Sequence, residues 1–140
     1  MSDEFRISSE LAEEMVQHCI EGRPNEACGM LGIKDGTVVK IFRMTNALRS
    51  PVRYRLDSTE QLAVHNTLYS EGWDWAAFHS HTHTEAYPSP TDIREKRDDV
   101  PYVIVSLATD PPEIRAFRIE KEDWAGDEGV VQEIPVTILP

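Results

Sequence analysis

The apolar run Tyr-Val-Ile-Val-Ser-Leu at residues 102–107 constrains the fold more than any other stretch of this 140-residue chain. A strand with one face in water alternates apolar and polar residues, whereas this run is apolar almost throughout. It therefore predicts a strand that is buried on both faces of its sheet. Such a sheet needs covering layers, and we expect helices to provide them.

Helix signals occur at three places in the chain. Apolar side chains recur at helical spacing between Ser9 and Gly22, with Ser9 as the expected N-cap. A second helix is predicted at residues 59–70, which a capping sequence precedes and a glycine follows. A short third helix is expected after Ser89, because Pro90 suits the first helical position.

The remaining regular segments have the residue pattern of strands. Asp35-Gly36 joins two apolar runs and predicts a tight hairpin. The predicted strands are residues 28–33, 37–44, 52–56, 73–81, 102–107, 113–119 and 130–138. Helices alternate with strands early in the chain, and strands follow one another late. This order predicts a single α/β domain, residues 1–140, in which helices pack on a mixed central sheet.

The chain is strongly acidic. It has 25 acidic and 14 basic residues and a formal charge of −11, so we expect no nucleic acid and no anionic membrane as a partner. The opening residues lack an apolar core of signal-peptide length, and no apolar run is long enough to span a bilayer, which favours a cytoplasmic protein. Cys19 and Cys28 are expected to be buried free thiols. The oligomeric state stays open.

Two histidines and an aspartate form a candidate metal site. His79 and His81 project from the same face of their predicted strand, because side chains alternate between its faces. Asp92, at the start of the next helix, can add an oxygen ligand. Two imidazole nitrogens and one carboxylate oxygen suit a catalytic Zn²⁺ with water in the open fourth position. The full pattern, His-x-His, seven residues, Ser-x-x-Asp, arises by chance about once in a thousand such chains.

The same residues also have ordinary structural interpretations. Ser89 and Asp92 form a capping arrangement by themselves, and a His-x-His pair on a strand can be a hydrogen-bonded surface patch. Glu26, just before the first predicted strand, is the candidate general base of a zinc hydrolase, although a single glutamate in a loop is more often simply solvated. The joint pattern favours the metal site, since a capped turn has no reason to follow a His-x-His pair at this distance.

A glutamate ahead of an apolar strand, followed by His-x-His and Ser-x-x-Asp, resembles the JAMM (MPN-plus) metalloprotease family. The residues that match its motif are Glu26, His79, Ser80, His81, Ser89 and Asp92. The segments PNEACGMLG, MTNALRSPVRYRLDSTEQL, HSHTHTEAYPSPTD and YVIVSLATDP resemble the bacterial Mec-type branch of this family. The resemblance extends from about Pro24 to Pro111.

The resemblance implies both a fold and a set of roles. The fold is a three-layer α/β architecture, similar to that of cytidine deaminases, with a mixed central sheet between helices. By resemblance, His79, His81 and Asp92 bind Zn²⁺. Glu26 acts as general base and then as proton donor to the leaving amine, and Ser89 steadies the water or the developing oxyanion. Together these groups supply what amide hydrolysis requires.

The resemblance also implies a substrate. Mec-type enzymes act on a small ubiquitin-like sulfur-carrier protein (ThiS/MoaD-like) conjugated to cysteine, and they release that cysteine for cysteine biosynthesis. Arg49, Arg53 and Arg55 concentrate positive charge in an acidic chain, so we hypothesise that Arg53 or Arg55 pairs with the cysteine carboxylate; a solvated strand face is an equal alternative. His83 departs from the family pattern. It can compete for the metal, bind a product carboxylate, or stand as a loop histidine at the mouth of the cleft.

Three other functions share parts of this pattern. A JAMM isopeptidase or C-terminal processing peptidase for another ubiquitin-like protein uses the same chemistry and differs only in its partner. A non-catalytic MPN binding module lacks metal ligands, which this sequence has. A zinc nucleoside deaminase needs a Pro-Cys-x-x-Cys pair, which this sequence lacks. The predicted class is therefore a zinc metallopeptidase.

Overall fold

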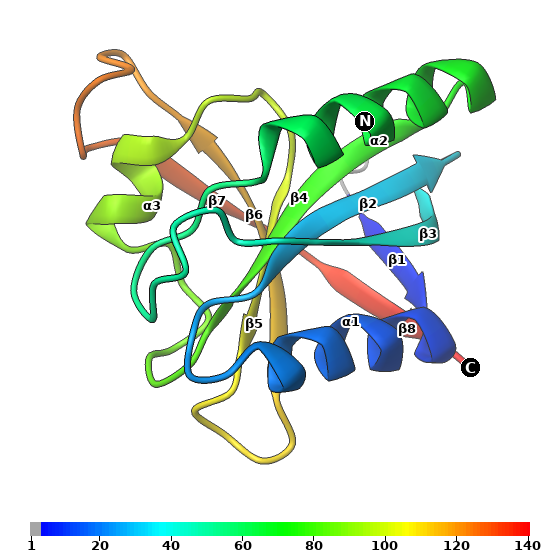
Figure 1. Cartoon of the computed structure of the whole chain (residues 1–140), viewed down its shortest axis with the longest axis horizontal. Helices are drawn as coiled ribbons and strands as arrows, with labels where there is room; N and C mark the ends of the chain where they lie inside the picture. Colours follow the sequence, from blue (N-terminus) through cyan, green and yellow to red (C-terminus); the bar gives the residue numbers. More distant parts are fainter. Residues whose placement is uncertain (1–3) are drawn as a thin grey trace.

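The computed structural model describes residues 4–140 and contains one mixed sheet with three helices (Figure 1). The strands are β1 (Phe5–Ser8), β2 (Cys28–Lys34), β3 (Thr37–Met44), β4 (Asp74–His81), β5 (Tyr102–Ser106), β6 (Glu113–Glu120), β7 (Val130–Ile134) and β8 (Val136–Leu139). The helices are α1 (Ser9–Gly22), α2 (Ser58–Glu71) and α3 (Pro90–Glu95). Within this described part, none of the helices has the length and apolar character needed to cross a bilayer.

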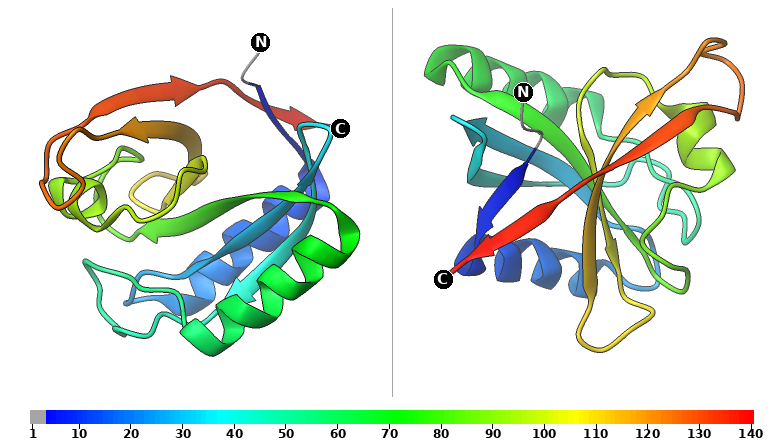
Figure 2. Two further views of the ribbon diagram at one scale, coloured as in Figure 1. Left: turned by 90° about the horizontal axis from the view of Figure 1, so that it is seen from above. Right: turned by 180° about the vertical axis from the view of Figure 1, so that it is seen from behind.

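The strands form a single sheet in the order β7-β6-β5-β4-β2-β3-β1-β8. The pairs β4–β5, β1–β3 and β1–β8 are parallel, and the other pairs are antiparallel. β7 and β8 stand at opposite ends of this order although only Pro135 separates them in the sequence. The sheet therefore curls until its two ends approach each other, as Figure 2 shows from above. The Phe5 N–H donates to the Pro135 carbonyl at 2.9 Å at this junction.

Helices cover both faces of the sheet. Met30 and Leu31 are neighbours on β2 and so point to opposite faces. Leu31 belongs to a buried cluster with Met15 of α1, whereas Met30 packs with Val64 of α2. α1 and α2 therefore lie on opposite sides, and the predicted α/β class, with helices packed on a mixed central sheet, is confirmed.

β4 lies in the middle of the sheet, and its side chains alternate between the face covered by α1 and the face covered by α2 and α3. Phe78 joins the core beneath α1, whereas Ala77 packs with Ile93 of α3. His79 and His81 lie on the same face of the strand as Ala77. Both histidines therefore face the side of the sheet that carries α2 and α3, at the end of β4.

Local sequence signals predicted several element boundaries correctly. Asp35 (φ 51°) and Gly36 (φ 78°) form the turn between β2 and β3 in the left-handed region that Asp-Gly favours. Gly72 ends α2 with φ 70°. α3 begins at Pro90, as expected. α1 extends over the predicted residues, with Ser8 as its N-cap in place of Ser9.

Two strand predictions were wrong, and one strand was not predicted. Residues 52–56 form no strand and contribute only an isolated bridge between Asn46 and Leu56. The single strand expected at residues 130–138 is two strands, because Pro135 has no N–H to continue the pairing. β1 was not predicted, since its four residues are too few for a recognisable alternation.

Candidate metal centre

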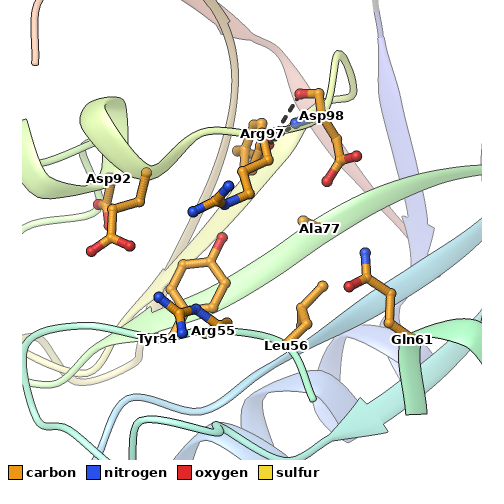
Figure 3. Close-up of a pocket in the computed structure, with 10 residues that line it drawn as sticks. Tyr54, Arg55, Leu56, Gln61, Ala77, Asp92, Arg97 and Asp98 are labelled. Atoms are coloured by element: carbon orange, nitrogen blue, oxygen red, sulfur yellow. Dashed lines mark hydrogen bonds between the residues drawn. The ribbon is translucent and has the colours of Figure 1, made fainter. Parts of the chain in front are cut away.

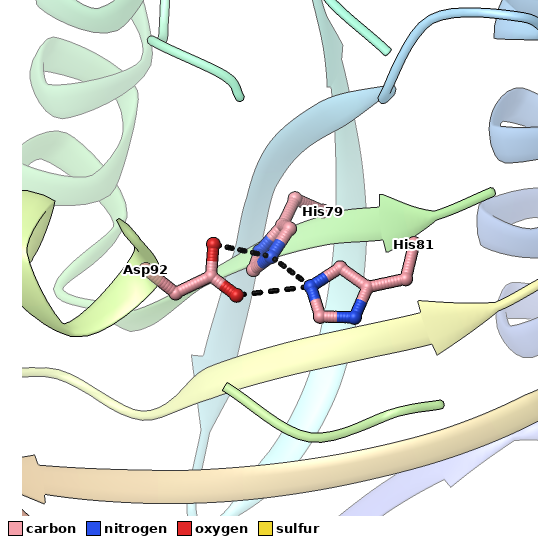
Figure 4. Close-up of side chains that lie close together, drawn as sticks. All are labelled: His79, His81 and Asp92. Carbon is pink, nitrogen blue, oxygen red and sulfur yellow. Dashed lines mark hydrogen bonds and ion pairs between the residues drawn. The ribbon is translucent and has the colours of Figure 1, made fainter. Parts of the chain in front are cut away.

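His79, His81 and Asp92 point toward one another at the end of β4 (Figure 4). His79 Nε2 lies 3.2 Å from both His81 Nε2 and Asp92 Oδ1. His81 Nε2 lies 2.9 Å from Asp92 Oδ2. The three side chains are only 1%, 4% and 8% exposed. Among residues 4–140, this is the group of ligand-type side chains close enough to share one metal ion.

A helix cap aims the Asp92 carboxylate at the histidines. The Ser89 N–H donates to Asp92 Oδ2 at 2.9 Å, and the Asp92 N–H donates to Ser89 Oγ at 3.0 Å. This reciprocal pair is a capping box at the start of α3. The carboxylate direction is therefore fixed by backbone geometry before any ligand binds.

The two imidazoles are oriented by different means. His81 Nδ1 lies 2.7 Å from the Glu85 carbonyl oxygen, so Nδ1 donates there and Nε2 keeps its lone pair for a metal ion. His79 Nδ1 is buried and has no hydrogen-bond partner among the described residues. Its ring instead stacks on Tyr54, with ring centroids 4.4 Å apart and planes 18° apart. Tyr54 therefore supplies the orientation that a hydrogen bond supplies at His81.

The three side chains fit a tetrahedral zinc ion. Ligand atoms about 2.0–2.1 Å from zinc lie roughly 3.3 Å from one another, which is close to the separations of 2.9 and 3.2 Å between the side chains here. Burial raises the pKa of Asp92, but the charge of His79 and the hydrogen bonds from His79, His81 and the Ser89 amide outweigh it, and the pKa falls well below its usual range. An ionised carboxylate between two buried imidazoles favours a divalent cation.

Glu26 places a second buried carboxyl group beside this cluster. Its side chain is 5% exposed, and Oε1 has no hydrogen-bond partner among the described residues. Burial raises the pKa of Glu26 to about 7, with Asp92 adding to the rise and both histidines opposing it. A carboxyl group with a pKa near neutrality can both take up and return a proton.

The loop between β3 and α2, residues 45–57, holds Glu26 and Tyr54 in place; we call it the strap. The Glu26 N–H donates to the Ser50 carbonyl at 2.9 Å. The Asn46 side chain donates to the carbonyls of Glu26 and Arg53, each at 2.9 Å. Its oxygen accepts two further backbone amides of the strap, at 3.0 and 3.2 Å. The buried Asn46 side chain thus joins the strap to the backbone of Glu26, the candidate base.

Two cavities adjoin the cluster. The first, which we call the Glu26 cavity, has a volume of about 300 Å³ and includes Glu26, His81 and Ser89 in its lining. The second, the Arg55 cavity, has a volume of about 210 Å³ and is lined in part by Asp92 and Arg55. Figure 3 shows the side chains around the Arg55 cavity. A substrate that crosses the cluster therefore has a space on the Glu26 side and a space on the Asp92 side.

The predicted substrate-binding residues occupy different positions. Arg53 forms an ion pair with Glu95 at 2.6 Å. Arg55 lines its cavity, and Arg49 lies exposed on the strap with φ 47°. His83 is not in the metal-ligand group; its Nδ1 lies 2.9 Å from the Thr82 hydroxyl, and the residue lines the Glu26 cavity.

Sequence reasoning missed three residues that shape the site. Tyr54 and Asn46 lie in a segment that was interpreted as loop and strand, and neither belongs to a spaced motif. Arg97, which also lines the Arg55 cavity, follows α3 in a charged stretch that looks like a solvated surface. No sequence signal distinguished these three residues from their neighbours.

Metal-assisted amide hydrolysis needs convergent ligands and a carboxyl group within reach, and this face of the sheet provides both. The fold and site thus define a metal-dependent hydrolase. Comparison with known families then identifies the group: the chain belongs to Prok-JAB, the prokaryotic homologs of the JAB domain, whose family model matches residues 8–120. The predicted membership of the JAMM family is confirmed.

Similar proteins support the same class. The chain is 40% identical over 139 residues to the CysO-cysteine peptidase of Mycobacterium tuberculosis, covering 95% of this chain and 90% of that protein. It is 36% identical over 112 residues to the probable TtuB-protein conjugate cleaving protease of Thermus thermophilus, covering 78% and 72%. The solution structure of DSY2949 from Desulfitobacterium hafniense matches with a TM-score of 0.82 at 34% identity, covering 96% and 92%. The protein is a JAMM-type metallopeptidase.

Proposed function

We propose that this protein uses zinc to hydrolyse the amide between the C-terminal glycine of a small ubiquitin-like sulfur-carrier protein and cysteine, which releases cysteine. One observation carries the proposal: the buried Glu26 carboxyl adjoins the His79, His81 and Asp92 cluster in a chain 40% identical to a CysO-cysteine peptidase. A cytoplasmic location is part of the proposal, and the two free thiols are consistent with it.

The residues divide the chemistry between them. Zinc held by His79, His81 and Asp92 would lower the pKa of water to about 7 and polarise the scissile carbonyl. In our proposal Glu26 takes a proton from the attacking water as its oxygen bonds to the carbonyl carbon. Glu26 then gives that proton to the leaving nitrogen as the C–N bond breaks. A pKa of about 7 suits both transfers.

Ser89 is proposed to stabilise the developing oxyanion. Its Oγ accepts the Asp92 N–H in the capping box, so the hydroxyl proton stays available for donation. Ser89 lines the same cavity as Glu26. A fixed hydroxyl in a partly dry site stabilises negative charge better than bulk water does.

None of the three arginines is among the residues that line the Glu26 cavity. In place of the hypothesised pairing of Arg53 or Arg55 with the cysteine carboxylate, we therefore propose that the arginines contact the carrier protein. Arg55 is the best placed, because it lines a cavity next to Asp92. Arg53 already pairs with Glu95, and Arg49 is exposed on the strap, so both would contact the carrier at the rim of the site. The extended carrier tail can also add main-chain hydrogen bonds along an exposed backbone edge.

A second candidate is cleavage of a conjugate of another ubiquitin-like protein. The observation that favours it is the 36% identity to a probable TtuB-protein conjugate cleaving protease. The same ligands and the same base would serve that reaction, because only the leaving amine changes. The two candidates therefore differ in substrate and not in mechanism.

Mass spectrometry of a carrier protein that ends in Gly-Gly-Cys tests the proposal. After incubation with zinc-loaded enzyme, we expect the carrier to lose the mass of one cysteine. Glu26→Gln should abolish the loss while zinc stays bound, and a chelator should abolish it in the wild type. An intact carrier with zinc demonstrably bound would reject this substrate and favour the second candidate.

A further inference from the structure

The Glu26 cavity has the size and lining of a site for one amino acid. Its volume of about 300 Å³ lies at the small end of the range for small-molecule sites, roughly 300–1,000 Å³. The hydroxyl-bearing residues Thr84, Ser89 and Thr91 line it, and the strap adds the apolar residue Val52. The cavity therefore offers several hydrogen-bonding groups in a small volume.

Glu26 determines which end of the substrate enters this cavity. The group that protonates the leaving nitrogen must lie within hydrogen-bond reach of it. Glu26 lines this cavity and is not among the residues that line the Arg55 cavity. The leaving amine, and whatever is attached to it, consequently occupies the Glu26 cavity, while the carrier tail extends on the Asp92 side.

A leaving amino acid brings a carboxylate into this space, which needs hydrogen-bond donors. The ionised form of Glu26 and the formal charge of −11 on the chain both oppose a second anion. Of the described residues that line the cavity, His83 and the metal ligand His81 are the basic ones. When the Thr82 hydroxyl donates to His83 Nδ1, at 2.9 Å, the neutral ring carries its proton on Nε2. His83 then presents an N–H donor held by its neighbour.

We propose that the Glu26 cavity binds the leaving amino acid and that His83 recognises its free α-carboxylate, assisted by the hydroxyls of Thr84 and Thr91. This inference rests on the function proposed above. It makes the enzyme selective for a conjugate whose leaving group is a terminal amino acid. A leaving residue that ends in an amide, or continues as a protein chain, lacks the anion that His83 binds.

A matched pair of substrates tests the inference on the wild-type enzyme. One carrier ends in Gly-Gly-Cys with a free carboxylate, and the other ends in the same residues with a C-terminal carboxamide. With zinc-loaded enzyme we expect kcat/KM to be about 10- to 100-fold higher for the free acid, mainly through KM, which is the range for a hydrogen bond to a charged group.

Variants at residue 83 assign the preference to that side chain. His83→Leu should raise KM for the free acid until the preference is less than about 3-fold, and it should change KM for the carboxamide much less, because a hydrogen bond to a neutral acceptor is weaker than one to a carboxylate. His83→Gln keeps an N–H donor near the position of Nε2 and should retain part of the preference. His65→Gln is the matched control, because His65 packs edge-on against Trp75 and lines neither cavity. Zinc affinity should be the same in all three variants.

The outcomes separate this inference from the proposed function. Equal turnover of both carriers by the wild type would overturn the inference and leave the proposed function standing. Failure of zinc-loaded wild type to cleave either carrier would overturn both. Loss of zinc affinity in His83→Leu would show that His83 acts on the metal ligands, and this too would overturn the inference.

Discussion

At the scale of single residues, Glu26 shows how burying the proposed catalytic carboxyl group opposes folding at neutral pH. Burial raises its pKa to about 7 from an ordinary value of 4.5. In the metal-free protein the folded carboxyl therefore keeps its proton at pH values where the unfolded one has lost it. Because the folded pKa is the higher one, its contribution to stability is complete below the unfolded pKa and is lost as the pH rises to about 7.

Replacing Glu26 by glutamine should separate stability from activity. With chelator present, we expect Glu26→Gln to be more stable than wild type at about pH 8, by up to about 3 kcal/mol, and equally stable near pH 4. With zinc, its kcat should fall roughly 10²- to 10⁴-fold. Urea unfolding at the two pH values measures the first effect, with the exposed Glu71→Gln as control. The same difference in stability at both pH values would contradict this account of Glu26.

Tyr54 is expected to control metal affinity through its stack on His79. Tyr54→Leu should weaken zinc binding about 2- to 10-fold, because an aromatic pair contributes roughly 0.5–1.5 kcal/mol beyond its buried area. Tyr54→Phe keeps the ring and should bind zinc as tightly as wild type. Competition with a chromogenic chelator gives these affinities. Tyr69→Leu serves as control, since Tyr69 on α2 is 92% exposed; an equal loss in this variant would refute the role of the stack.

The contrast between His79 and Tyr54 shows which parts of a site can be predicted from sequence. His79 and His81 share a face because strand side chains alternate, and Asp92 follows from the residues of a helix cap. These relations are local, so spacing in the sequence is enough to predict them. Tyr54 meets His79 across a separation of 25 residues through an irregular loop, and no periodic pattern encodes that contact.

At the scale of elements, the strap shows how an irregular segment becomes rigid. Asn46 makes four hydrogen bonds with four different backbone groups, one of them the Glu26 carbonyl. Its side chain is buried, so water cannot replace these bonds. The apolar and basic residues at 52–56 suggested a strand. The Asn46 side chain, however, forms hydrogen bonds with backbone groups that a strand would have used for pairing.

Asn46→Ala should therefore loosen the whole strap. We expect a loss of about 2–4 kcal/mol in the free energy of unfolding, because several buried backbone groups lose their partner. Urea denaturation measures this loss. Asn66→Ala, on the exposed face of α2, is the control and should change stability by less than about 0.5 kcal/mol. A similarly small change for Asn46→Ala would mean that the strap is held by other contacts.

The contrast between local patterns, which sequence predicts, and long-range contacts, which it does not, also holds for the strands of the sheet. The hairpin of β2 and β3 and the buried β5 follow from local composition, and both were predicted. β1 and β8 have only four residues each and pair with each other from opposite ends of the chain. Their pairing depends on the curl of the whole sheet, with Pro135 marking the change of partner, and a local pattern contains no information about such a closure.

At the scale of the whole molecule, the candidate metal ligands His79, His81 and Asp92 come from two elements, β4 and α3. β4 lies in the centre of the sheet and packs against the cores on both faces. Asp92 belongs to α3, a helix of six residues whose buried side chain is Ile93. A bound ion would therefore connect a short helix directly to the most central strand, so its binding energy should contribute to the stability of the folded protein.

Metal removal should consequently lower the melting temperature, and the size of the shift can be calculated by mass action. With free zinc at about 1,000 times its dissociation constant, the stabilisation is about 4 kcal/mol, which corresponds to roughly 10–15 °C for a chain of this size. Calorimetry with zinc and with a chelator measures the difference within one protein.

In His79→Gln the shift should shrink to a few degrees, because this change removes one ligand nitrogen and disturbs no helix cap. The shift should also decrease in acid, since the imidazoles must lose their protons to bind metal. If His79→Gln kept the full zinc-dependent shift at neutral pH, the stabilising ion would bind elsewhere, and the link between β4 and α3 would not be the source of the effect.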